Sequence, residues 1–178
     1  MTDADTLSDF IRFSAESYPA DRYELILWDH GGGTMTGFGY DELYEDTSLT
    51  LSSLSTALYN GGVQFDFIGF DACLMATAEV AYALDPYADY LIASEESEPG
   101  EGWAYKNWLT MLAEDPAVPT AELGKKLVDD FLEAYIFADM PTLSVLDLRY
   151  VPELYAALES YWGSAYTALQ SGSYGAFS

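Results

Sequence analysis

Hydrophobic and polar positions divide the chain into short apolar runs and longer stretches with helical spacing. The short runs are rich in strand-forming residues and are bounded by polar or glycine-containing segments, which is typical of buried strands. They cover residues 23–28, 65–70, 90–93 and 143–147. Helical spacing extends up to Tyr18 and over residues 48–60, 74–84, 102–114, 120–138 and 151–169.

Strands that alternate with helices favour a mostly parallel sheet with helices on both faces. The predicted fold class is therefore α/β, with a three-layer α/β/α sandwich. We expect one domain over residues 1–170, followed by a linker or tail over residues 171–178, which are rich in glycine and serine. In open parallel sheets, catalytic groups gather beyond the carboxyl ends of the strands.

Composition narrows the classes of function. Half of the residues are hydrophobic and 16% are aromatic, so the chain is not a disordered acidic tail. Six Lys and Arg face 30 Asp and Glu, and the net charge of −24 repels nucleic acid and anionic lipid. No apolar run reaches the roughly 18 residues of a membrane span. We expect the acids to form a solubilising surface, with attraction of cationic ligands or calcium as the alternative.

The single cysteine and single histidine are the candidate catalytic residues. One of each excludes an internal disulfide, cysteine-based zinc sites and most catalytic zinc sets. His30 follows the predicted strand at 23–28, and Cys73 follows the predicted strand at 65–70, so both fall at the same edge of the sheet. Cys73 is expected in the first turn of the next helix, where the helix N-terminus favours the thiolate. His30 can then take its proton.

Glycines at positions 31 to 33 follow the histidine and allow the backbone to turn sharply near a substrate. The amides of Gly31 and Cys73 are candidates for an oxyanion hole. Structural roles remain open at this point, since a lone cysteine is more often a buried apolar residue and a lone histidine a hydrogen-bonded one.

The sequence gives less support to other kinds of functional site. The His-Gly-Gly-Gly segment occurs in some lipases, but neither a Gly-x-Ser-x-Gly elbow nor a second histidine is present. The glycines lack a phosphate-loop pattern and its lysine, and no EF-hand pattern occurs. Adjacent acids suggest a glycosidase only weakly, because so acidic a chain contains many such pairs.

Two segments, Leu25-Ile-Leu-Trp-Asp-His-Gly-Gly-Gly33 and Ile68-Gly-Phe-Asp-Ala-Cys-Leu-Met75, resemble the histidine and cysteine motifs of the clostripain-like cysteine peptidases. A third, Ser94-Glu-Glu-Ser-Glu-Pro-Gly-Glu-Gly-Trp103, resembles the loop after the next strand in that family. The resemblance covers roughly residues 7–169 and implies a caspase-like fold, shared with caspases, gingipains, legumain and separase. It implies Cys73 as nucleophile, His30 as base, and the Gly31 and Cys73 amides at the oxyanion, with no third triad member.

The resemblance also implies a peptide or protein substrate that is cleaved after Arg or Lys. It places Asp71 and Glu95 as acids of the specificity pocket and Trp103 as a wall. From the residues alone, Asp71 would be a helix N-cap and Glu95 a solvated loop charge. No cofactor is implied as required, calcium is possible, and a secreted or cell-envelope bacterial protein is expected. A binding module without activity, or a peptidase with another preference, remains the alternative.

The chain departs from the family pattern in two respects. Some members mature by cleavage after a basic residue between the two motifs, but no Lys or Arg occurs between Arg22 and Lys106. That activation route is not expected within this segment. The family domain also begins with an apolar strand and an acidic turn, and no matching segment precedes Leu7. We therefore expect the first strand to be missing here or supplied otherwise.

Overall fold

A four-stranded sheet forms the centre of the computed structural model, which describes residues 2–44, 47–136, 141–170 and 172. The strands lie in the order β1 (Glu24–Trp28), β4 (Phe65–Asp71), β5 (Ala88–Ala93) and β6 (Ser144–Asp147). The pairs β1–β4 and β4–β5 are parallel, and β5–β6 is antiparallel. The prediction of a mostly parallel sheet is confirmed.

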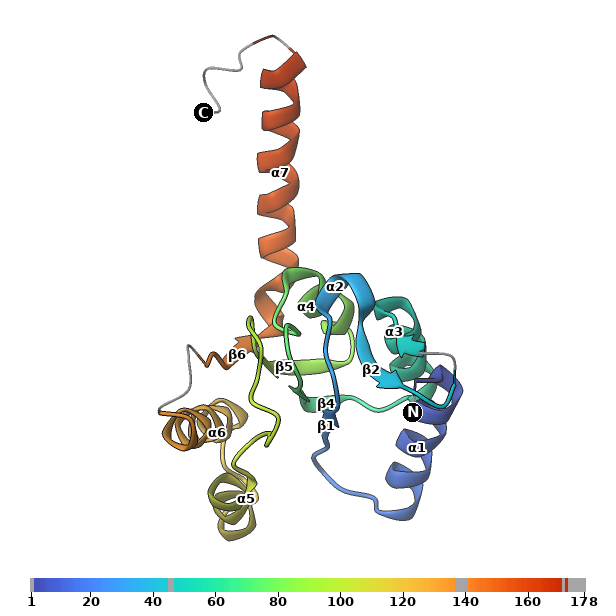
Figure 1. Cartoon of the computed structure of the whole chain (residues 1–178), viewed down its shortest axis with the longest axis vertical. Coiled ribbons are helices and arrows are strands. Elements are labelled where there is room, and N and C mark those ends of the chain that lie inside the picture. Colours follow the sequence, from blue (N-terminus) through green and yellow to red (C-terminus); the bar gives the residue numbers. More distant parts are fainter. Residues whose placement is uncertain (1, 45–46, 137–140, 171, 173–178) are drawn as a thin grey trace.

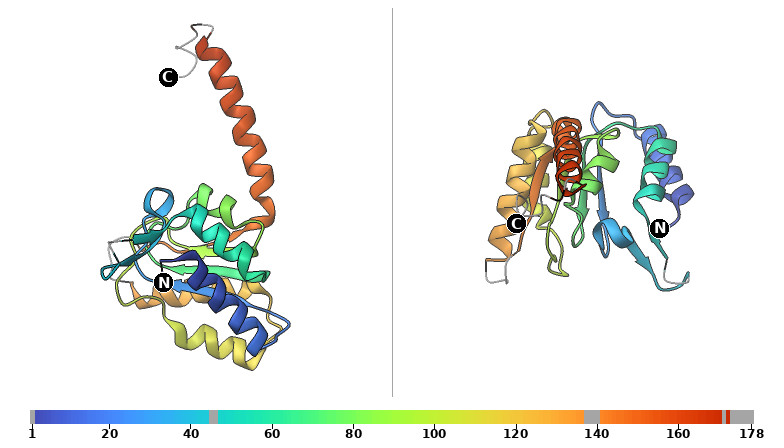
Figure 2. Two further views of the ribbon diagram at one scale, coloured as in Figure 1. Left: turned by 90° about the vertical axis from the view of Figure 1, so that its right-hand side faces the viewer. Right: turned by 90° about the horizontal axis from the view of Figure 1, so that it is seen from above.

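Helices cover both faces of this sheet (Figures 1 and 2). One face carries α1 (Ala4–Ser17), α3 (Leu51–Gly61), α4 (Ala78–Leu84) and the start of α7 (Val151–Gln170). The other face carries α5 (Tyr105–Glu114) and α6 (Thr120–Ala134). Each face has its own apolar core: Ile68 and Phe70 contribute to the first, and Phe67 and Ile92 to the second. The three-layer sandwich is therefore confirmed.

Helix α7 extends away from the body after its first turns, as Figure 1 shows. Val151 and Ala165 are its buried residues, whereas Tyr161, Trp162 and Tyr166 are more than half exposed. None of the helices in the described part of the chain has both the length and the hydrophobicity needed to span a bilayer.

The predicted boundaries need three corrections. The helix expected over 74–84 begins only at Ala78, because Leu74 and Ala76 donate backbone hydrogen bonds to the segment after β5 instead. A hairpin of β2 (Phe38–Asp41) and β3 (Thr47–Leu49), which was not predicted, follows the short helix α2 (Gly33–Thr36). The helix expected to reach residue 138 ends at Ala134. Residues 137 and 138 lie outside the described residues, as does the expected tail except for residue 172.

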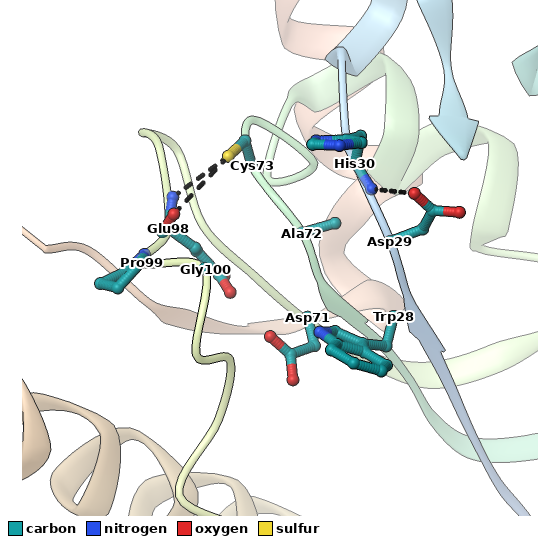
Figure 3. A pocket seen from close by; sticks show the side chains of 9 residues that line it. All are labelled: Trp28, Asp29, His30, Asp71, Ala72, Cys73, Glu98, Pro99 and Gly100. Atoms are coloured by element: carbon teal, nitrogen blue, oxygen red, sulfur yellow. Dashed lines mark hydrogen bonds between the residues drawn. The ribbon is translucent and has the colours of Figure 1, made fainter. Parts of the chain in front are cut away.

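The carboxyl ends of β1 and β4 lie side by side, with Trp28 opposite Asp71 in the parallel register. The chain leaves β1 toward His30 and leaves β4 toward Cys73, and the two loops line one pocket (Figure 3). The apolar runs that form these strands thus fix the place of the site, because parallel strands have their carboxyl ends at one edge.

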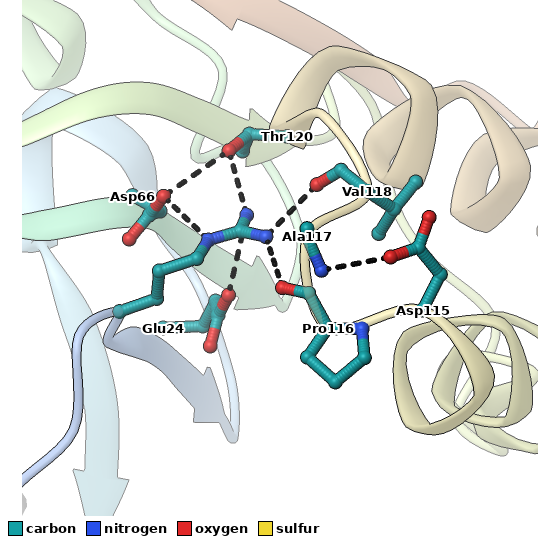
Figure 4. A network of polar contacts seen from close by, with 8 residues as sticks. Glu24, Asp66, Asp115, Pro116, Ala117, Val118 and Thr120 are labelled. Atoms are coloured by element: carbon teal, nitrogen blue, oxygen red, sulfur yellow. Dashed lines mark hydrogen bonds and ion pairs between the residues drawn. The ribbon is translucent and has the colours of Figure 1, made fainter.

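A single arginine ties together the opposite end of the same strands (Figure 4). Arg22 Nε donates to Asp66 at 2.9 Å. Its Nη1 donates to the carbonyl oxygens of Pro116 and Val118 at 2.9 and 2.8 Å, and its Nη2 donates to Thr120 Oγ1 at 3.0 Å. The guanidinium therefore joins β1, β4 and the loop between α5 and α6, a task that its fork of donors suits better than an ammonium.

Replacing Arg22 by Ala should lower the free energy of unfolding by about 2–3 kcal/mol, since several partly buried acceptors lose their donor. Arg22→Lys should recover only part of this loss. Arg12 forms an exposed ion pair with Asp9 on α1, and Arg12→Ala is the matched control, with an expected cost of about 0–0.5 kcal/mol. Urea denaturation measures all three variants. Equal losses for Arg22→Ala and Arg12→Ala would contradict the assigned role.

Candidate active site

A pocket of about 510 Å³ opens at the carboxyl edge of the sheet. Its walls come from the end of β1, the end of β4 and the loop that follows β5. The lining residues are Trp28, Asp29, His30, Asp71, Ala72, Cys73, Glu98, Pro99 and Gly100. The structure therefore brings together three of the residues predicted from sequence, namely His30, Asp71 and Cys73.

Cys73 lies in the turn between β4 and α4 and not in a helix. Helix α4 begins at Ala78 and is capped by Thr77, whose side chain accepts from Val80 N. The expectation that a helix N-terminus activates Cys73 is wrong, because the effect of the helix dipole fades beyond the first turn. Leu74 has a φ of 63°, a conformation that costs a branched residue energy. Its amide donates to Glu96 O at 3.0 Å, which helps to hold this turn.

Gly31 places the histidine loop directly against the cysteine loop. A Cβ atom at position 31 would lie 2.0 Å from the carbonyl oxygen of Cys73, so only glycine fits there. Gly32 N donates to Gly37 O and Gly39 N to His30 O, and both bonds flank the bridge between Gly31 and Phe38. This ladder does not use the Gly31 amide, which is consistent with the predicted oxyanion role of the Gly31 and Cys73 amides.

The sulfur of Cys73 is held by the loop after β5 (Figure 3). Glu98 N donates to Cys73 Sγ at 3.2 Å, and the Glu98 carbonyl oxygen lies 3.9 Å from the same sulfur. No hydrogen bond joins the side chains of His30 and Cys73 within the described ranges. The imidazole instead lies edge-on to Tyr40, with ring centroids 6.4 Å apart. The sulfur is thus engaged by the backbone of Glu98 in this structure.

Asp71 is a buried carboxylate, 3% exposed, at the last position of β4. Its Oδ2 accepts from Trp103 N at 2.9 Å and from Tyr105 OH at 2.7 Å. Gly102, with a φ of 75°, lets the backbone approach, since a Cβ there would lie 2.7 Å from the same oxygen. The N-cap alternative for Asp71 is wrong, because Thr77 caps the following helix.

Glu98 supplies a second carboxyl group beside Asp71. Its Oε2 accepts from Trp103 Nε1 at 3.1 Å, whereas its Oε1 is buried without a partner in the described structure. Burial, reinforced by the charge of Asp71, raises the pKa of Glu98 to about 8. Proximity of the Asp71 carboxyl group, to which a protonated Glu98 can donate, adds a smaller upward contribution to the same pKa.

Two tyrosines support this acidic wall from the α5–α6 side. Burial, followed by the hydrogen bond to Asp71, raises the pKa of Tyr105, so its hydroxyl remains a donor to that carboxylate. Tyr135 OH donates to Gly102 O at 2.6 Å and fixes the glycine that packs on Asp71. Asp71 is therefore held rigidly on three sides.

The other predicted pocket residues lie elsewhere. Glu95 accepts from Ser144 Oγ and is not among the residues that line the pocket. Trp103 is 4% exposed and lies behind Asp71 and Glu98, packed over Gly69. Sequence reasoning missed Glu98 and Trp28. The loop after β5 contains several glutamates, and its sequence does not indicate which of them turns inward.

The described part of the chain contains no recognisable metal-binding site. No group of three or more His, Cys, Asp or Glu side chains among the described residues is arranged to hold a metal ion. Calcium dependence therefore stays a prediction.

Fold and site define an α/β protein of caspase-like architecture with a histidine and a cysteine in one pocket. A family model of the clostripain family (peptidase C11) matches residues 1–173. The chain belongs to this family of cysteine peptidases.

Several relatives show the extent of the match. Clostripain of Hathewaya histolytica is 34% identical over 122 residues, which are 59% of this chain and 23% of that protein. A secreted C11 cysteine protease from Bacteroides thetaiotaomicron, solved with an irreversible peptide inhibitor, is 29% identical with a TM-score of 0.73, over 88% of this chain and 48% of that one. An inactive zymogen of a C11 protease from Parabacteroides distasonis is 30% identical with a TM-score of 0.69, over 87% and 42%. The chain thus spans less than half the length of these relatives.

The stability of the protein should depend on pH through Glu98. The folded state holds the Glu98 proton up to about pH 8, whereas the unfolded chain releases it near the ordinary pKa of 4.5. The free energy of unfolding therefore falls as pH rises through this window. Glu98→Gln removes this dependence, so the variant should gain stability relative to the parent between about pH 5 and about pH 9. Denaturation curves across this range measure it, with Glu101→Gln as control. A constant difference would refute the proton assignment.

Gly31→Ala should destabilise the protein by about 2–4 kcal/mol, because the new methyl group collides with the Cys73 carbonyl. Gly100, which lines the pocket from the loop after β5, has open space around its Cβ position. Gly100→Ala should therefore change stability by about 0.5 kcal/mol or less. Chemical denaturation of both variants checks the pair, and similar small effects would show that the two loops do not pack as tightly as described.

Proposed function

We propose that this protein is an endopeptidase in which Cys73 is the nucleophile and His30 the general base. One observation carries the proposal: the only cysteine and the only histidine of the chain line one pocket, at the ends of adjacent parallel strands. Membership of the clostripain family supports it. Each residue alone would suit a structural role, but their convergence on an open pocket favours catalysis.

The reaction uses one proton carrier in two stages. His30 takes the thiol proton, and the Cys73 thiolate attacks the peptide carbonyl carbon. The amides of Gly31 and Cys73 stabilise the resulting oxyanion. His30 then gives its proton to the leaving amine, so that the peptide bond breaks and a thioester remains. A water molecule, deprotonated by His30, hydrolyses the thioester and restores the thiol.

The pocket favours a basic residue on the amino side of the cleaved bond. Asp71 and Glu98 present two carboxyl groups, and a guanidinium or ammonium group from the substrate would find acceptors there. Trp28, 67% exposed at the rim, offers an apolar face for the aliphatic part of such a side chain. One structurally similar clostripain from Bacteroides thetaiotaomicron, 26% identical, was solved with the peptide inhibitor BTN-VLTK-AOMK, in which a lysine precedes the final group. We therefore propose Arg or Lys at this position.

Secretion is part of the proposal, by likeness to the Bacteroides thetaiotaomicron relative that is described as secreted. The acidic chain suits that setting, since a high net charge keeps a protein soluble. No metal is assigned a role in the chemistry, and calcium is included below as a variable of the assay.

A second candidate function is a peptide-binding module that does not cleave. The observation in its favour is the sulfur of Cys73, which is engaged by the Glu98 backbone and makes no hydrogen bond with His30 in the described structure. Such a module would use the same acidic pocket and the same basic ligands.

The test incubates the protein with fluorogenic peptides carrying Arg, Lys, Asn or Asp before the cleaved bond, with and without calcium. Turnover should require Arg or Lys and should fall about 10⁴-fold or more in Cys73→Ala. Asp71→Asn should lower kcat/KM for Arg peptides about 10- to 100-fold and spare any cleavage after Asn. Glu98→Gln should affect Arg peptides more than Glu95→Gln, because only Glu98 lines the pocket.

The outcomes separate the candidates. Absence of Cys73-dependent turnover under every condition, together with binding of basic peptides, would favour the binding module. Equal loss on all substrates in Asp71→Asn would assign that residue a structural role.

A further inference from the structure

Glu98 touches both halves of the site at once. Its backbone amide and carbonyl contact the sulfur of Cys73, while its side chain lies between Trp103 and Asp71. No other residue of the described structure hydrogen-bonds to that sulfur. A change in the position or protonation of the Glu98 carboxyl group can therefore alter the contacts that hold the Cys73 sulfur, because both belong to one residue.

The loop that carries Glu98, residues 95–102, is anchored at both of its ends. At one end, Ser94 Oγ bonds to Thr142 Oγ1 at 2.8 Å and accepts from Glu96 N at 3.1 Å. At the other end, Tyr135 fixes the carbonyl of Gly102. Gly100 is exposed and has free space around it. Movement of Glu98 breaks its contacts with the Cys73 sulfur and with Trp103 Nε1, whereas Asp71 is buried at the end of β4 and belongs to the sheet.

The acidic wall of the pocket contains a carboxyl oxygen without a hydrogen-bond donor in the described structure. Glu98 Oε1 is buried and lacks a donor, and the hydrogen bond that it can make with Asp71 requires a shared proton. A guanidinium or ammonium group provides several donors and a positive charge in place of that single proton. Its entry would separate the two carboxyl groups and release the proton to solvent, which leaves the charge of the pocket unchanged.

We propose that Glu98 couples occupancy of the pocket to release of the nucleophile: a cationic side chain entering between Asp71 and Glu98 draws residues 95–102 off Cys73 Sγ. The thiol is then free to turn toward His30. This inference rests on the proposed function and makes Glu98 a positioning residue, which acts on the sulfur through its own backbone. A substrate without a cation leaves the loop in place, so specificity is expressed in the reactivity of the thiol as well as in binding.

Several other ionisable groups face Glu98. Asp71 approaches from β4, Tyr105 from α5 and Tyr135 from the end of α6, while Glu101 lies on the same loop. The pocket wall opposite carries His30. The experiment is therefore done at one fixed pH, so that titration of these groups does not enter the comparison.

The test measures alkylation of Cys73 by iodoacetamide, in which the thiolate displaces iodide and the proton passes to the buffer. Cys73 is the only cysteine, so mass spectrometry follows this one reaction. Methylguanidinium, which has the charge and donors of an arginine side chain without its aliphatic stem, is the pocket probe. It should accelerate alkylation about tenfold, the effect expected when the contacts that hold the sulfur are lost. Tetramethylammonium, which has the same charge and no donors, should not accelerate it.

Variants assign the effect to Glu98. Glu98→Gln keeps the backbone contacts and resembles the protonated acid, so its alkylation rate should not respond to methylguanidinium; Glu98→Ala should not respond either. Glu101→Gln, an acid of the same loop, is the matched control and should respond like the parent protein. An unchanged rate in the parent protein, or equal acceleration in Glu98→Gln, would overturn the inference. Alkylation needs no peptide turnover, so this result is separate from that of the peptidase assay.

Discussion

The parallel pairing of β1 with β4 is the constraint on which the site depends. Its register sets Trp28 opposite Asp71, so the loops that begin after these residues start side by side. The loops then pack closely, because Gly31 has no side chain and lies against the Cys73 carbonyl. A slip of one residue would turn each side chain of the strand to the opposite face and separate the histidine from the cysteine. The convergence of His30 and Cys73 on one pocket therefore depends on backbone pairing.

Burying acidic side chains in the pocket costs free energy, and hydrogen bonds from neighbouring residues offset part of this cost. A buried carboxylate is unfavourable unless it is hydrogen-bonded or paired with a cation. Asp71 is satisfied by a backbone amide and a tyrosine hydroxyl, whereas Glu98 has one oxygen without a donor in the described structure, and burial raises its pKa to about 8. The two acids therefore differ in how far the surrounding structure satisfies them. The proposed preference for Arg or Lys follows from this difference, because a cationic side chain supplies the donor that Glu98 lacks.

Family membership and local geometry account for different features of this protein. Membership of the clostripain family accounts for the order of the motifs and for the caspase-like fold. The geometry adds what the motifs do not state, namely that the loop after β5 covers the sulfur and that Glu98 faces the pocket while Glu95 faces Ser144. Both glutamates lie in the segment from Ser94 to Trp103, which contains four glutamates. Only the path of the loop in space distinguishes them.

The sequence by itself determined the alternation of strands and helices, and with it the layered fold and the edge at which His30 and Cys73 lie. These follow from the periodicity of apolar residues, which is a local property. The tertiary structure decided the surroundings of Cys73, which lies in a turn held by the loop after β5 and not in a helix. It also decided which acids meet. Such contacts join residues far apart in sequence, and their geometry depends on loop conformations that local patterns do not encode.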